Sequence, residues 1–478
     1  MTQPKKRVFI GRERELAILK DLSLSRSASF AVIKGRRRIG KSRLIQEFGK
    51  SLRTLYFLGL APEEKISPYD QRRHFANQLE KQIGVGGIQA HDWDHLFGHL
   101  AKQASSGQIL IVLDEINWMG SKDPTFLPKL KTAWDTEFSK NPQLILILSG
   151  SMSGWIEDHI LKSTGFLGRI TQDITLEELP LNKCSQFWGS HAKRVSAYEK
   201  FKILSVTGGV PLYLELIRPD LTAEENIQRL CFSREGLLFN EFDRIFSDLF
   251  SRRTKTYRKI IEQLTYTAAP MDRILSQLGT KASGVFSDYL DDLVKTGYLT
   301  RDHTWSIKTL RESKTSQYRL KDNYLRFYLR YIEPKRNLIN RVGTITPPQW
   351  HTIMGFQFEN LVLNNRPALY QILGLNSNEI EFDNPFIQTK TKAREGCQID
   401  LLIQTHYHTL YLCEIKFSKK EIGVSIIQEV QEKIKRLVLP RGFSIRPVLI
   451  HVNGVSESVE DSDFFSHIVD FSRLFEGG

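Results

Sequence analysis

Short apolar runs alternate with longer stretches of helical periodicity along residues 1–175. The runs have strand length and fall at residues 30–34, 54–59, 108–114, 144–149 and 170–176. Strands that are apolar on both faces and separated by helices are typical of a parallel sheet with helices on each side. The first third of the chain therefore predicts an α/β domain built on a parallel sheet.

The remaining residues predict three further parts. Residues 176–250 have mostly helical periodicity, interrupted by Gly-Gly-Val-Pro at 208–211. Residues 251–334 predict three helices followed by a hairpin, and the glycine and prolines within 335–350 indicate a linker. Residues 351–478 predict a second α/β unit in the order helix, hairpin, helix, strand (446–452), helix. The chain thus predicts four parts.

Composition narrows the class of protein. Of the 478 residues, 41% are apolar and 25% charged, as in ordinary globular proteins. No apolar run approaches the roughly 20 residues of a membrane-spanning helix, and the N-terminal residues lack the apolar stretch of a secretory signal. The four cysteines have no paired spacing, which argues against a disulfide framework or a zinc site. We expect a reduced, cytoplasmic protein with no membrane partner.

The formal net charge of +13 is unevenly placed. Residues 251–341 contain 19 Lys and Arg against nine Asp and Glu, so this segment carries most of the excess. A basic domain favours a polyanionic partner, most often nucleic acid. On charge alone, a solvated basic face is an equal alternative.

Residues 35–42 have the spacing of a phosphate-binding loop between an apolar strand and an amphipathic helix. Glycines let backbone N–H groups approach phosphates, and the helix N-terminus adds positive charge. We expect Lys41 to reach the β- and γ-phosphates of ATP and the Ser42 hydroxyl to coordinate Mg²⁺. The predicted nucleotide-binding residues of the loop are Gly35, Arg36, Arg37, Arg38, Ile39, Gly40, Lys41 and Ser42.

Acidic and hydroxyl side chains follow two later strands. Residues 109–115 form an apolar run that ends in Asp114 and Glu115, at the carboxyl end where α/β sites lie. We expect Asp114 to hold Mg²⁺ and Glu115 to polarise the attacking water. After the next strand come Ser149 and Ser151; we favour Ser149 as the residue that senses the γ-phosphate, with a simple turn as the alternative. Arg169 is a candidate for supplying positive charge to the transferring phosphate, either in its own chain or in a neighbouring subunit. An ordinary surface arginine is an equal alternative.

These motifs occur together with Val-Phe-Ile-Gly-Arg-Glu-Arg-Glu at 8–15, Phe-Leu-Gly-Arg at 166–169 and the 208–211 break. In that combination the first 250 residues resemble the archaeal/bacterial ATPase family, in the STAND-like branch of AAA+ P-loop proteins. The resemblance implies that Phe9, Gly11 and Arg12 lie near the adenine. It also implies that residues 1–175 are the ATPase core and 176–250 a helical lid over the nucleotide. A homo-oligomer is a separate expectation, and the sequence alone leaves the oligomeric state open.

The basic segment has the element order of a winged helix, three helices and a β-ribbon, over residues 251–334. Its third helix, 280–297, places Val285, Phe286, Leu290, Leu293 and Val294 on the inward face. Recognition helices present their N-terminal residues to the major groove of DNA. The predicted nucleic-acid contacts are Lys281, Ser283 and Ser287 on the helix, and Arg301, Lys308, Arg311 and Lys314 on the wing. Winged helices also serve as protein-packing modules, so that alternative stays open.

Residues 398–416 predict a hairpin that gathers charge on one face. If its centre is Tyr407, Asp400 pairs with Glu414, and Lys416 points to the same face as Glu414. Charges on one buried face are costly unless paired or metal-bound. The carboxylates suit Mg²⁺, or Mn²⁺ in its place, with Lys416 activating water at a phosphodiester. Glu359, on the preceding helix, is a further candidate ligand.

This arrangement resembles the PD-(D/E)XK nuclease core: a helix glutamate, a strand aspartate, Glu-x-Lys on the next strand and a helix containing Gln428. The chain departs from the pattern because Gln-Ile, rather than a proline, precedes Asp400. A fold of this kind that has lost catalysis is the alternative. The favoured function is therefore an ATPase coupled to DNA, with a nuclease-like C-terminal domain at 351–478 that cuts or grips the strand. One alternative is a STAND-type nucleotide switch whose C-terminal domain is an effector or inert. A second alternative is a pure nucleic-acid-binding regulator.

Overall fold

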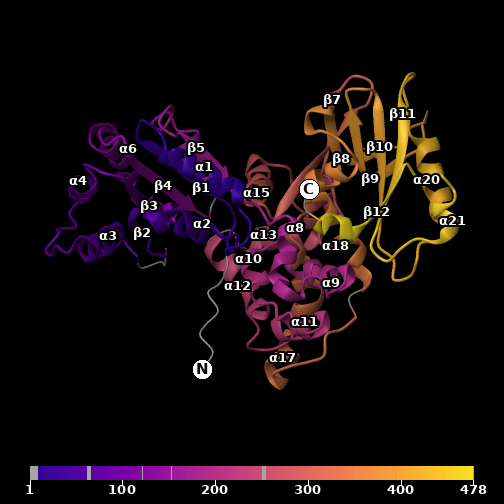
Figure 1. Ribbon diagram of the computed structural model, residues 1–478, viewed down its shortest axis with the longest axis horizontal. Coiled ribbons are helices and arrows are strands. Elements are labelled where there is room, and N and C mark those ends of the chain that lie inside the picture. The colour runs from indigo at the N-terminus through magenta and orange to yellow at the C-terminus, as the bar shows by residue number, and fades with distance from the viewer. Residues whose placement is uncertain are drawn as a thin grey trace. The chain divides into compact units, whose positions relative to one another are not determined.

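The computed structural model describes residues 9–61, 66–120, 122–151, 153–249, 254–349, 351–392 and 394–476 (Figure 1). The chain divides into two compact units, residues 1–177 and 178–478. Val8, which opens the predicted 8–15 motif, and residues 251–253, at the start of the basic segment, lie outside the described residues. Within the described ranges, no helix is long and apolar enough to cross a membrane. The finer division into four parts stays a prediction.

A five-stranded parallel sheet forms the centre of the first unit, as predicted. Its strands are β1 (Ser29–Lys34), β2 (Arg53–Leu58), β3 (Ile109–Asp114), β4 (Leu144–Gly150) and β5 (Gln172–Thr175). They lie in the order β2-β3-β4-β1-β5, and every pairing is parallel. All five predicted strands are confirmed to within two residues at either end. The order places the carboxyl ends of β1 and β3 on either side of β4.

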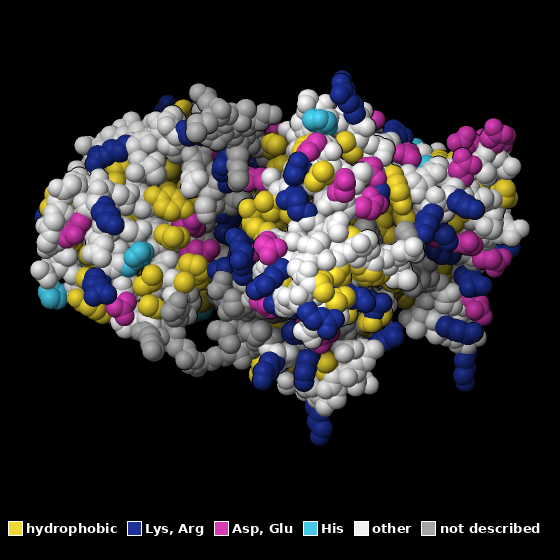
Figure 2. Space-filling view, turned by 90° about the horizontal axis from the view of Figure 1, so that it is seen from below, with side chains coloured by type: hydrophobic (Ala, Val, Ile, Leu, Met, Phe, Trp, Pro, Cys, Tyr) yellow, Lys and Arg dark blue, Asp and Glu magenta, His cyan; other side chains and the backbone are white. Residues whose placement is uncertain are grey.

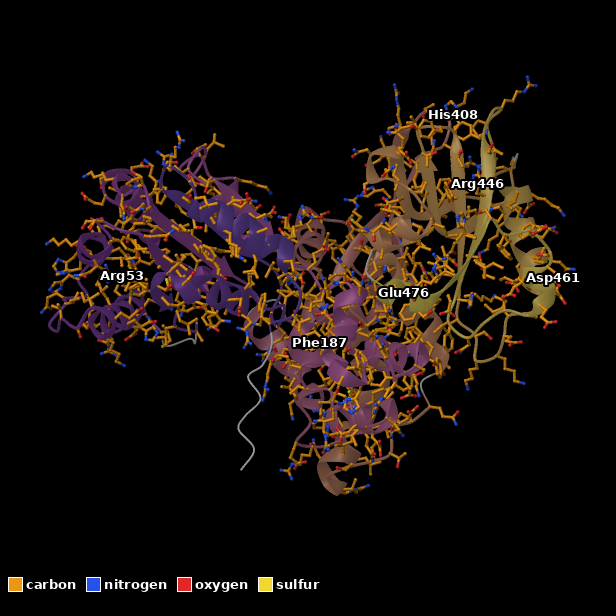
Figure 3. The ribbon with its side chains drawn as sticks, viewed as in Figure 1. Arg53, Phe187, His408, Arg446, Asp461 and Glu476 are labelled. Carbon is orange, nitrogen blue, oxygen red and sulfur yellow. The ribbon has the colours of Figure 1, made fainter. Side chains whose placement is uncertain are left out.

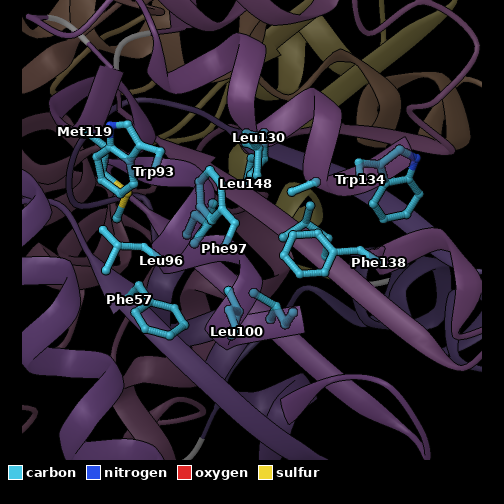
Figure 4. Close-up of a cluster of buried hydrophobic side chains, with 14 of the residues drawn as sticks. Phe57, Trp93, Leu96, Phe97, Leu100, Met119, Leu130, Trp134, Phe138 and Leu148 are labelled. Atoms are coloured by element: carbon cyan, nitrogen blue, oxygen red, sulfur yellow. The ribbon is translucent and has the colours of Figure 1, made fainter. Parts of the chain in front are cut away.

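Helices cover both faces of this sheet because its strands are apolar on both faces. Along β1, Phe30 and Val32 join one buried cluster, whereas Ala31 and Ile33 join another. The larger cluster, rich in aromatic side chains, is shown in Figure 4. The helices of this unit are α1 (Glu13–Ser23), α2 (Lys41–Phe48), α3 (Pro68–Ile83), α4 (Trp93–Gln103), α5 (Ile116–Gly120), α6 (Phe126–Thr136) and α7 (Ser153–Ile156).

The second unit begins with the predicted helical stretch. Its helices are α8 (Leu181–Cys184), α9 (Ala197–Thr207), α10 (Pro211–Leu214), α11 (Ala223–Cys231) and α12 (Leu237–Leu249). The predicted break falls between α9 and α10, where Gly208 has a φ of 55°. A Cβ on Gly209 would lie 2.2 Å from the carbonyl oxygen of Leu179, so the backbones approach too closely for another residue.

Three helices and a hairpin follow in the predicted order. They are α13 (Thr254–Gln263), α14 (Met271–Leu278), α15 (Gly284–Lys295), β6 (Leu299–Ser306) and β7 (Arg311–Leu320), after which come α16 (Asn323–Phe327) and α17 (Arg336–Val342). Two details of the sequence interpretation are wrong. Val285 is 54% exposed, because it lies in the first turn of α15, beyond the packed face. The expected linker at 335–350 contains α17, whose Ile339 is buried.

The C-terminal residues form a mixed five-stranded sheet. Its elements are α18 (His351–Leu363), α19 (Arg366–Ile372), β8 (Ile380–Gln388), β9 (Cys397–Thr405), β10 (Thr409–Lys416), α20 (Ser425–Arg436), β11 (Ser444–His451), α21 (Glu457–Glu460) and β12 (His467–Asp470). The order is β12-β11-β10-β9-β8. His408, labelled in Figure 3, has a φ of 55° in the turn that joins β9 to β10. Strands β8 and β12 were not predicted, since β8 contains Pro385 and two register shifts and β12 has four residues.

The β9–β10 register is the one that a hairpin centred on Tyr407 requires. Leu412 pairs with Leu402 and Cys413 with Leu401, so the next position along each strand brings Asp400 opposite Glu414. This prediction is confirmed.

The β6–β7 hairpin packs on the C-terminal sheet. Trp305 is 3% exposed, and its ring stacks on Phe382 at a centroid distance of 5.0 Å. The Trp305 indole N–H donates to Gln404 Oε1 (2.6 Å), and Gln404 Nε2 donates to the Ile307 carbonyl (3.0 Å). One side of the predicted wing is therefore part of the core of the second unit.

We expect Trp305→Ala to destabilise the second unit by about 3–5 kcal/mol, because it removes a buried ring and leaves Gln404 without its indole donor. Urea denaturation followed by circular dichroism measures the change. Tyr407→Ala is the matched control, since Tyr407 is 73% exposed at the tip of the β9–β10 hairpin. Equal effects of the two substitutions would contradict the packing role of Trp305.

Candidate functional site

The predicted phosphate-binding loop connects β1 to α2 in the first unit. Gly35 and Gly40 have φ values of 146° and 95°, and α2 begins at Lys41. A Cβ on Gly35 would lie 2.5 Å from the Leu176 carbonyl oxygen, so glycine is needed there by the protein backbone itself. Ile39 is fully buried and anchors the loop in the apolar cluster under α1 and α2. Arg38 has a φ of 68°, a strained value for a side chain of this size.

Lys41 is buried inside the loop, at 6% exposure. Its ammonium group donates to the carbonyl oxygens of Gly35 (2.8 Å) and Arg36 (3.1 Å). Burial lowers the pKa of Lys41, while Glu115 and Asp114 act to raise it. The cation thus lies within the field of both acidic residues that the sequence identified.

Asp114, at the end of β3, accepts hydrogen bonds from two hydroxyl groups on the same oxygen. Ser42 Oγ donates to Asp114 Oδ2 at 2.7 Å, and the Tyr56 hydroxyl donates to the same atom. Burial and the neighbouring Asp114 carboxylate raise the pKa of Tyr56 well above its ordinary value. The predicted pair of Ser42 and Asp114 is therefore brought together. Tyr56 was missed, although a tyrosine in an otherwise apolar strand is a signal that could have found it.

Glu115 adopts a φ of 50° and holds the backbone that follows β4. Its Oε2 accepts from the Ser151 hydroxyl (2.9 Å) and from the Ser151 N–H (3.3 Å). In contrast, the Ser149 hydroxyl is fully buried, and no described residue hydrogen-bonds to it. The amide of Asn117, 1% exposed, is likewise unsatisfied within the described residues. Buried polar groups without partners are rare and costly, and they concentrate at functional sites.

The arginines near the loop have protein contacts. Arg12 donates to the carbonyl oxygens of Ile39 (3.1 Å) and Glu177, and its other nitrogen lies 3.1 Å from Glu15. The Arg37 guanidinium lies over the Trp118 ring, 5.5 Å from its centroid. Arg36 is buried in the loop. The structure thus uses Arg12 to brace the loop, and its contact with a nucleotide stays a prediction.

Two other residues from the 8–15 motif lie beside the loop region. Phe9 packs against the apolar cluster that contains Ile39. Gly11 has a φ of 71°, which glycine adopts without strain. The expected adenine contact of both residues is untested.

Arg169 forms a bidentate ion pair with Asp135. Its Nε and Nη2 atoms donate to the two Asp135 oxygens at 2.6 and 2.9 Å. Hydrogen bonding from Arg169 lowers the pKa of Asp135 to about 2. Within a single chain, Arg169 is thus engaged by a surface carboxylate; a role toward a neighbouring subunit would require that pair to open.

The C-terminal carboxylates share one ammonium group that the sequence interpretation did not include. Lys433, on α20, lies 2.5 Å from Glu414 Oε2 and 4.0 Å from Asp400 Oδ1. Asp400 also accepts from the Ile415 N–H at 2.9 Å. Burial raises the pKa of Asp400 to about 6 and raises that of Glu414, which is 5% exposed, while Lys433 opposes both shifts. Lys416 points instead to Glu429 on α20, at 2.7 Å.

Glu359 lies on α18 among groups of both signs. Burial raises its pKa, whereas Arg319 and Arg326 act to lower it. It lines a small cavity of about 40 Å³ together with Asp302, Arg319 and Gln398. Among the described residues, no three His, Cys, Asp or Glu side chains gather closely enough to hold a metal ion. The paired carboxylates are therefore present, but Glu359 does not complete a three-ligand group.

The predicted nucleic-acid residues divide into engaged and exposed side chains. Ser283 is the N-cap of α15, because its hydroxyl accepts from the Phe286 N–H at 3.2 Å. Arg301 donates to Ser316 Oγ (2.9 Å) and lies over the Tyr318 ring. The remaining cations, Lys281, Lys308, Arg311 and Lys314, are exposed. On the face of the molecule drawn in Figure 2, basic side chains are spread among acidic ones rather than gathered in one patch.

Comparison with known proteins supports the interpretation of the first unit. Residues 9–217 match the model of an ATPase domain found predominantly in Archaea. Over 404 residues the chain is 26% identical to an uncharacterized protein of Methanocaldococcus jannaschii, covering 83% of this chain and 84% of that protein. This match and the loop geometry support an ATPase domain with a phosphate-binding loop in the first half of the chain.

Solved structures include proteins similar to this chain. One is a Walker-type ATPase of Pyrococcus abyssi, with 17% identity, 69% of this chain and 99% of that chain covered, and a TM-score of 0.49. Another is the ORC2 protein of Aeropyrum pernix, with 15% identity, 71% and 97% coverage, and a TM-score of 0.42.

We expect Ser151→Ala, but not Ser149→Ala, to lower the free energy of unfolding. Ser149→Ala removes a buried hydroxyl that has no described partner, so the free energy of unfolding should stay unchanged or rise by up to about 1 kcal/mol. Ser151→Ala removes a hydrogen bond to Glu115 and should cost about 1 kcal/mol. Denaturant titration of the nucleotide-free protein measures both.

ATP turnover then decides between the two serines as the sensor. If Ser149 contacts the γ-phosphate, Ser149→Ala lowers kcat by about tenfold or more although the fold is as stable as before. Normal turnover in that variant would exclude Ser149 from the reaction.

Proposed function

We propose that this chain is an ATP-hydrolysing protein whose second unit acts on nucleic acid through a metal-dependent site at Asp400 and Glu414. The observation that carries the second half is the β9–β10 register, which brings the half-buried Asp400 opposite the buried Glu414, with ammonium groups from Lys433 and Lys416 nearby. The ATPase half rests on the phosphate-binding loop and the matched ATPase domain.

Each residue of the nucleotide site has a defined task. The Lys41 ammonium, now satisfied by loop carbonyls, would exchange those oxygens for the β- and γ-phosphate oxygens of ATP, which are better acceptors because they are charged. Ser42, whose Oγ donates to Asp114 Oδ2 at 2.7 Å, would hold Mg²⁺ together with Asp114, and the ion would supply charge to the phosphates. Glu115 would orient the attacking water, with Ser151 fixing its carboxylate.

The donor chemistry of the C-terminal site fits a hard divalent cation. Carboxylate oxygens are the ligands that Mg²⁺ prefers, and Mg²⁺ commonly binds through one or two carboxylates while keeping several waters. Burial raises the pKa values of both Asp400 and Glu414, so the local environment opposes two negative charges without a balancing cation. The metal would supply a Lewis acid at a phosphodiester. Lys416, 39% exposed on the same strand as Glu414, would be the residue that orients or deprotonates water.

A second candidate function follows from Lys433. Its ammonium already balances Glu414 and approaches Asp400, so it takes the place that a cation would have. In that case the C-terminal domain is a structural or docking module, and the protein is a nucleotide-controlled switch of the STAND type. The two functions differ in whether Lys433 is a replaceable counter-ion or a permanent one.

Substitutions in the phosphate-binding loop test the ATPase. Lys41→Ala should weaken ATP binding by about 10- to 100-fold, because it removes charge-assisted hydrogen bonds to the phosphates. Glu115→Gln should bind ATP normally and lose about 10²- to 10⁴-fold in kcat. Nucleotide affinity and phosphate release measure the two effects. Arg53→Ala, on the exposed start of β2, is a control that should match the wild type.

Metal-induced stabilisation tests the C-terminal site. Saturating Mg²⁺ or Mn²⁺ should raise the Tm of the wild-type protein, since a ligand at 100 times its Kd stabilises by about 2.7 kcal/mol. Asp400→Asn should lose this shift, and Lys433→Met should enlarge it because the ammonium no longer competes with the metal. Lys416→Met should keep the shift and lose cleavage of DNA or RNA.

The same metal titrations would identify the second candidate function, a nucleotide-controlled switch. If the wild type gains no stability from either metal, cuts no nucleic acid, and Lys433→Met simply unfolds at lower temperature, then Lys433 is a permanent counter-ion. The second candidate function, in which the C-terminal domain is inert, would then be supported. The ATPase assignment would be unaffected.

A further inference from the structure

A groove separates the β6–β7 hairpin from the edge of the C-terminal sheet. Its volume is about 510 Å³, within the range of ligand-binding clefts. One wall consists of hairpin residues 304–308 and 311–313. The other consists of residues 386–389 at the end of β8, Arg394 and residues 438–440. Both walls belong to the second unit, and the Trp305 ring contacts Phe386 of the opposite wall at a centroid distance of 5.1 Å. We call this cleft the hairpin groove.

Exposed cations line this groove. They are Lys308, Arg311 and Arg394, and within the described part of the chain none of them has a carboxylate partner. Glu312 is the acidic residue of the lining. Elsewhere in the same unit, exposed cations such as Lys435 and Arg218 are paired with Glu432 and Asp220. Three exposed cations in one cleft favour an anionic ligand with more than one charge.

The groove also has an apolar lip. Val438 and Leu439 line it and are 53% and 38% exposed, although they lie directly after α20. Phe386 is buried deeper in the same wall. Exposed apolar side chains beside cations match the chemistry of an unpaired nucleotide strand, whose bases present apolar faces and whose backbone carries one charge per residue. A duplex hides its base faces, so it would leave the lip exposed to water.

The position of the groove connects it to the carboxylate cluster. Lys433 contacts Glu414 from α20, and Val438 and Leu439 follow the C-terminal end of that helix. Gln388, in the groove wall, also accepts from the Val438 N–H and donates to the Arg436 carbonyl, which fixes this segment against β8. A ligand in the groove would therefore contact the segment that directly follows the helix carrying Lys433.

We propose that the hairpin groove binds a single strand of nucleic acid, with Lys308, Arg311 and Arg394 on its phosphates and Val438 and Leu439 against its bases. This inference rests on the proposed function in taking nucleic acid as the partner of the second unit. It adds the binding surface and the strandedness, neither of which depends on the metal site being active.

Binding of a fluorescent oligonucleotide in EDTA, without nucleotide, tests the groove separately from cleavage. The triple variant Lys308→Ala/Arg311→Ala/Arg394→Ala should bind a single strand at least tenfold more weakly. The slope of log K against log salt should become shallower by about two units, near 0.7 for each phosphate that the variant no longer neutralises. Leu439→Ser should weaken binding without changing the slope.

The control variant removes the same charge elsewhere. Lys140→Ala/Arg218→Ala/Lys435→Ala deletes three exposed cations that are ion-paired, and it should keep wild-type affinity and slope. Equal losses in both triple variants would overturn the groove, because binding would then follow net charge alone. Preference for duplex over single strand would overturn the strandedness, and displacement of the oligonucleotide by poly-glutamate at matched charge would indicate an acidic protein partner instead.

Outcomes for the two proposals are distinguishable. If the wild type binds oligonucleotides and the groove variant binds equally well, the hairpin groove is not the binding surface. The proposal that the second unit acts on nucleic acid is then unaffected. If the wild type binds no DNA or RNA under any condition, including with Mg²⁺ and ATP, both the groove and the nucleic-acid function are wrong. Circular dichroism of each variant excludes misfolding as the cause.

Discussion

Both candidate sites depend on a carboxylate that is buried near the C-terminal end of a strand. Asp114 is 3% exposed and Glu414 is 5% exposed, and an isolated buried carboxylate is too costly to persist without partners. The partners differ. Asp114 receives two hydroxyl donors, from Ser42 and Tyr56, whereas Glu414 receives an ammonium from Lys433. Hydroxyl donors leave the negative charge in place, and an ammonium cancels it.

This difference has a chemical consequence for each site. A carboxylate held by neutral donors keeps its charge for an incoming cation, which suits a site that binds and releases Mg²⁺ with each nucleotide. A carboxylate held by Lys433 must exchange one cation for another before a metal can bind, so its affinity for metal is reduced by the strength of the existing ion pair. Asp114 thus keeps a charge that a cation could use, whereas at Glu414 a metal ion would first have to displace the Lys433 ammonium.

The basic segment shows why net charge predicts a partner only in part. Arg319 is buried and bonded to Asp302 and Asn360, and Arg326 is buried against the Gln357 side chain and the Leu320 carbonyl. Burial lowers the pKa of Arg326 to about 9. These arginines join the hairpin and α16 to α18, so part of the positive excess is structural. The charge on Lys308 and Arg311 remains available to solvent, which a count over the sequence cannot separate from the buried share.

The parallel sheet, the phosphate-binding loop and the β9–β10 register could all be predicted because they depend on local pattern: apolar runs, glycine spacing and a symmetrical turn. Tyr56, Trp305 and Lys433 depend on contacts between distant segments, which local pattern does not specify.

Lys433 nevertheless carried a signal. On α20 the buried residues Ile426, Ile427 and Val430 define one face, and position 433 falls on that face by the i, i+3 spacing. A lysine on a buried helical face requires an acidic partner on the surface against which the helix packs. Because the adjacent hairpin contains Asp400 and Glu414, helix phase and the cost of burying charge identify them as candidate partners of Lys433, while the contact itself depends on how α20 packs.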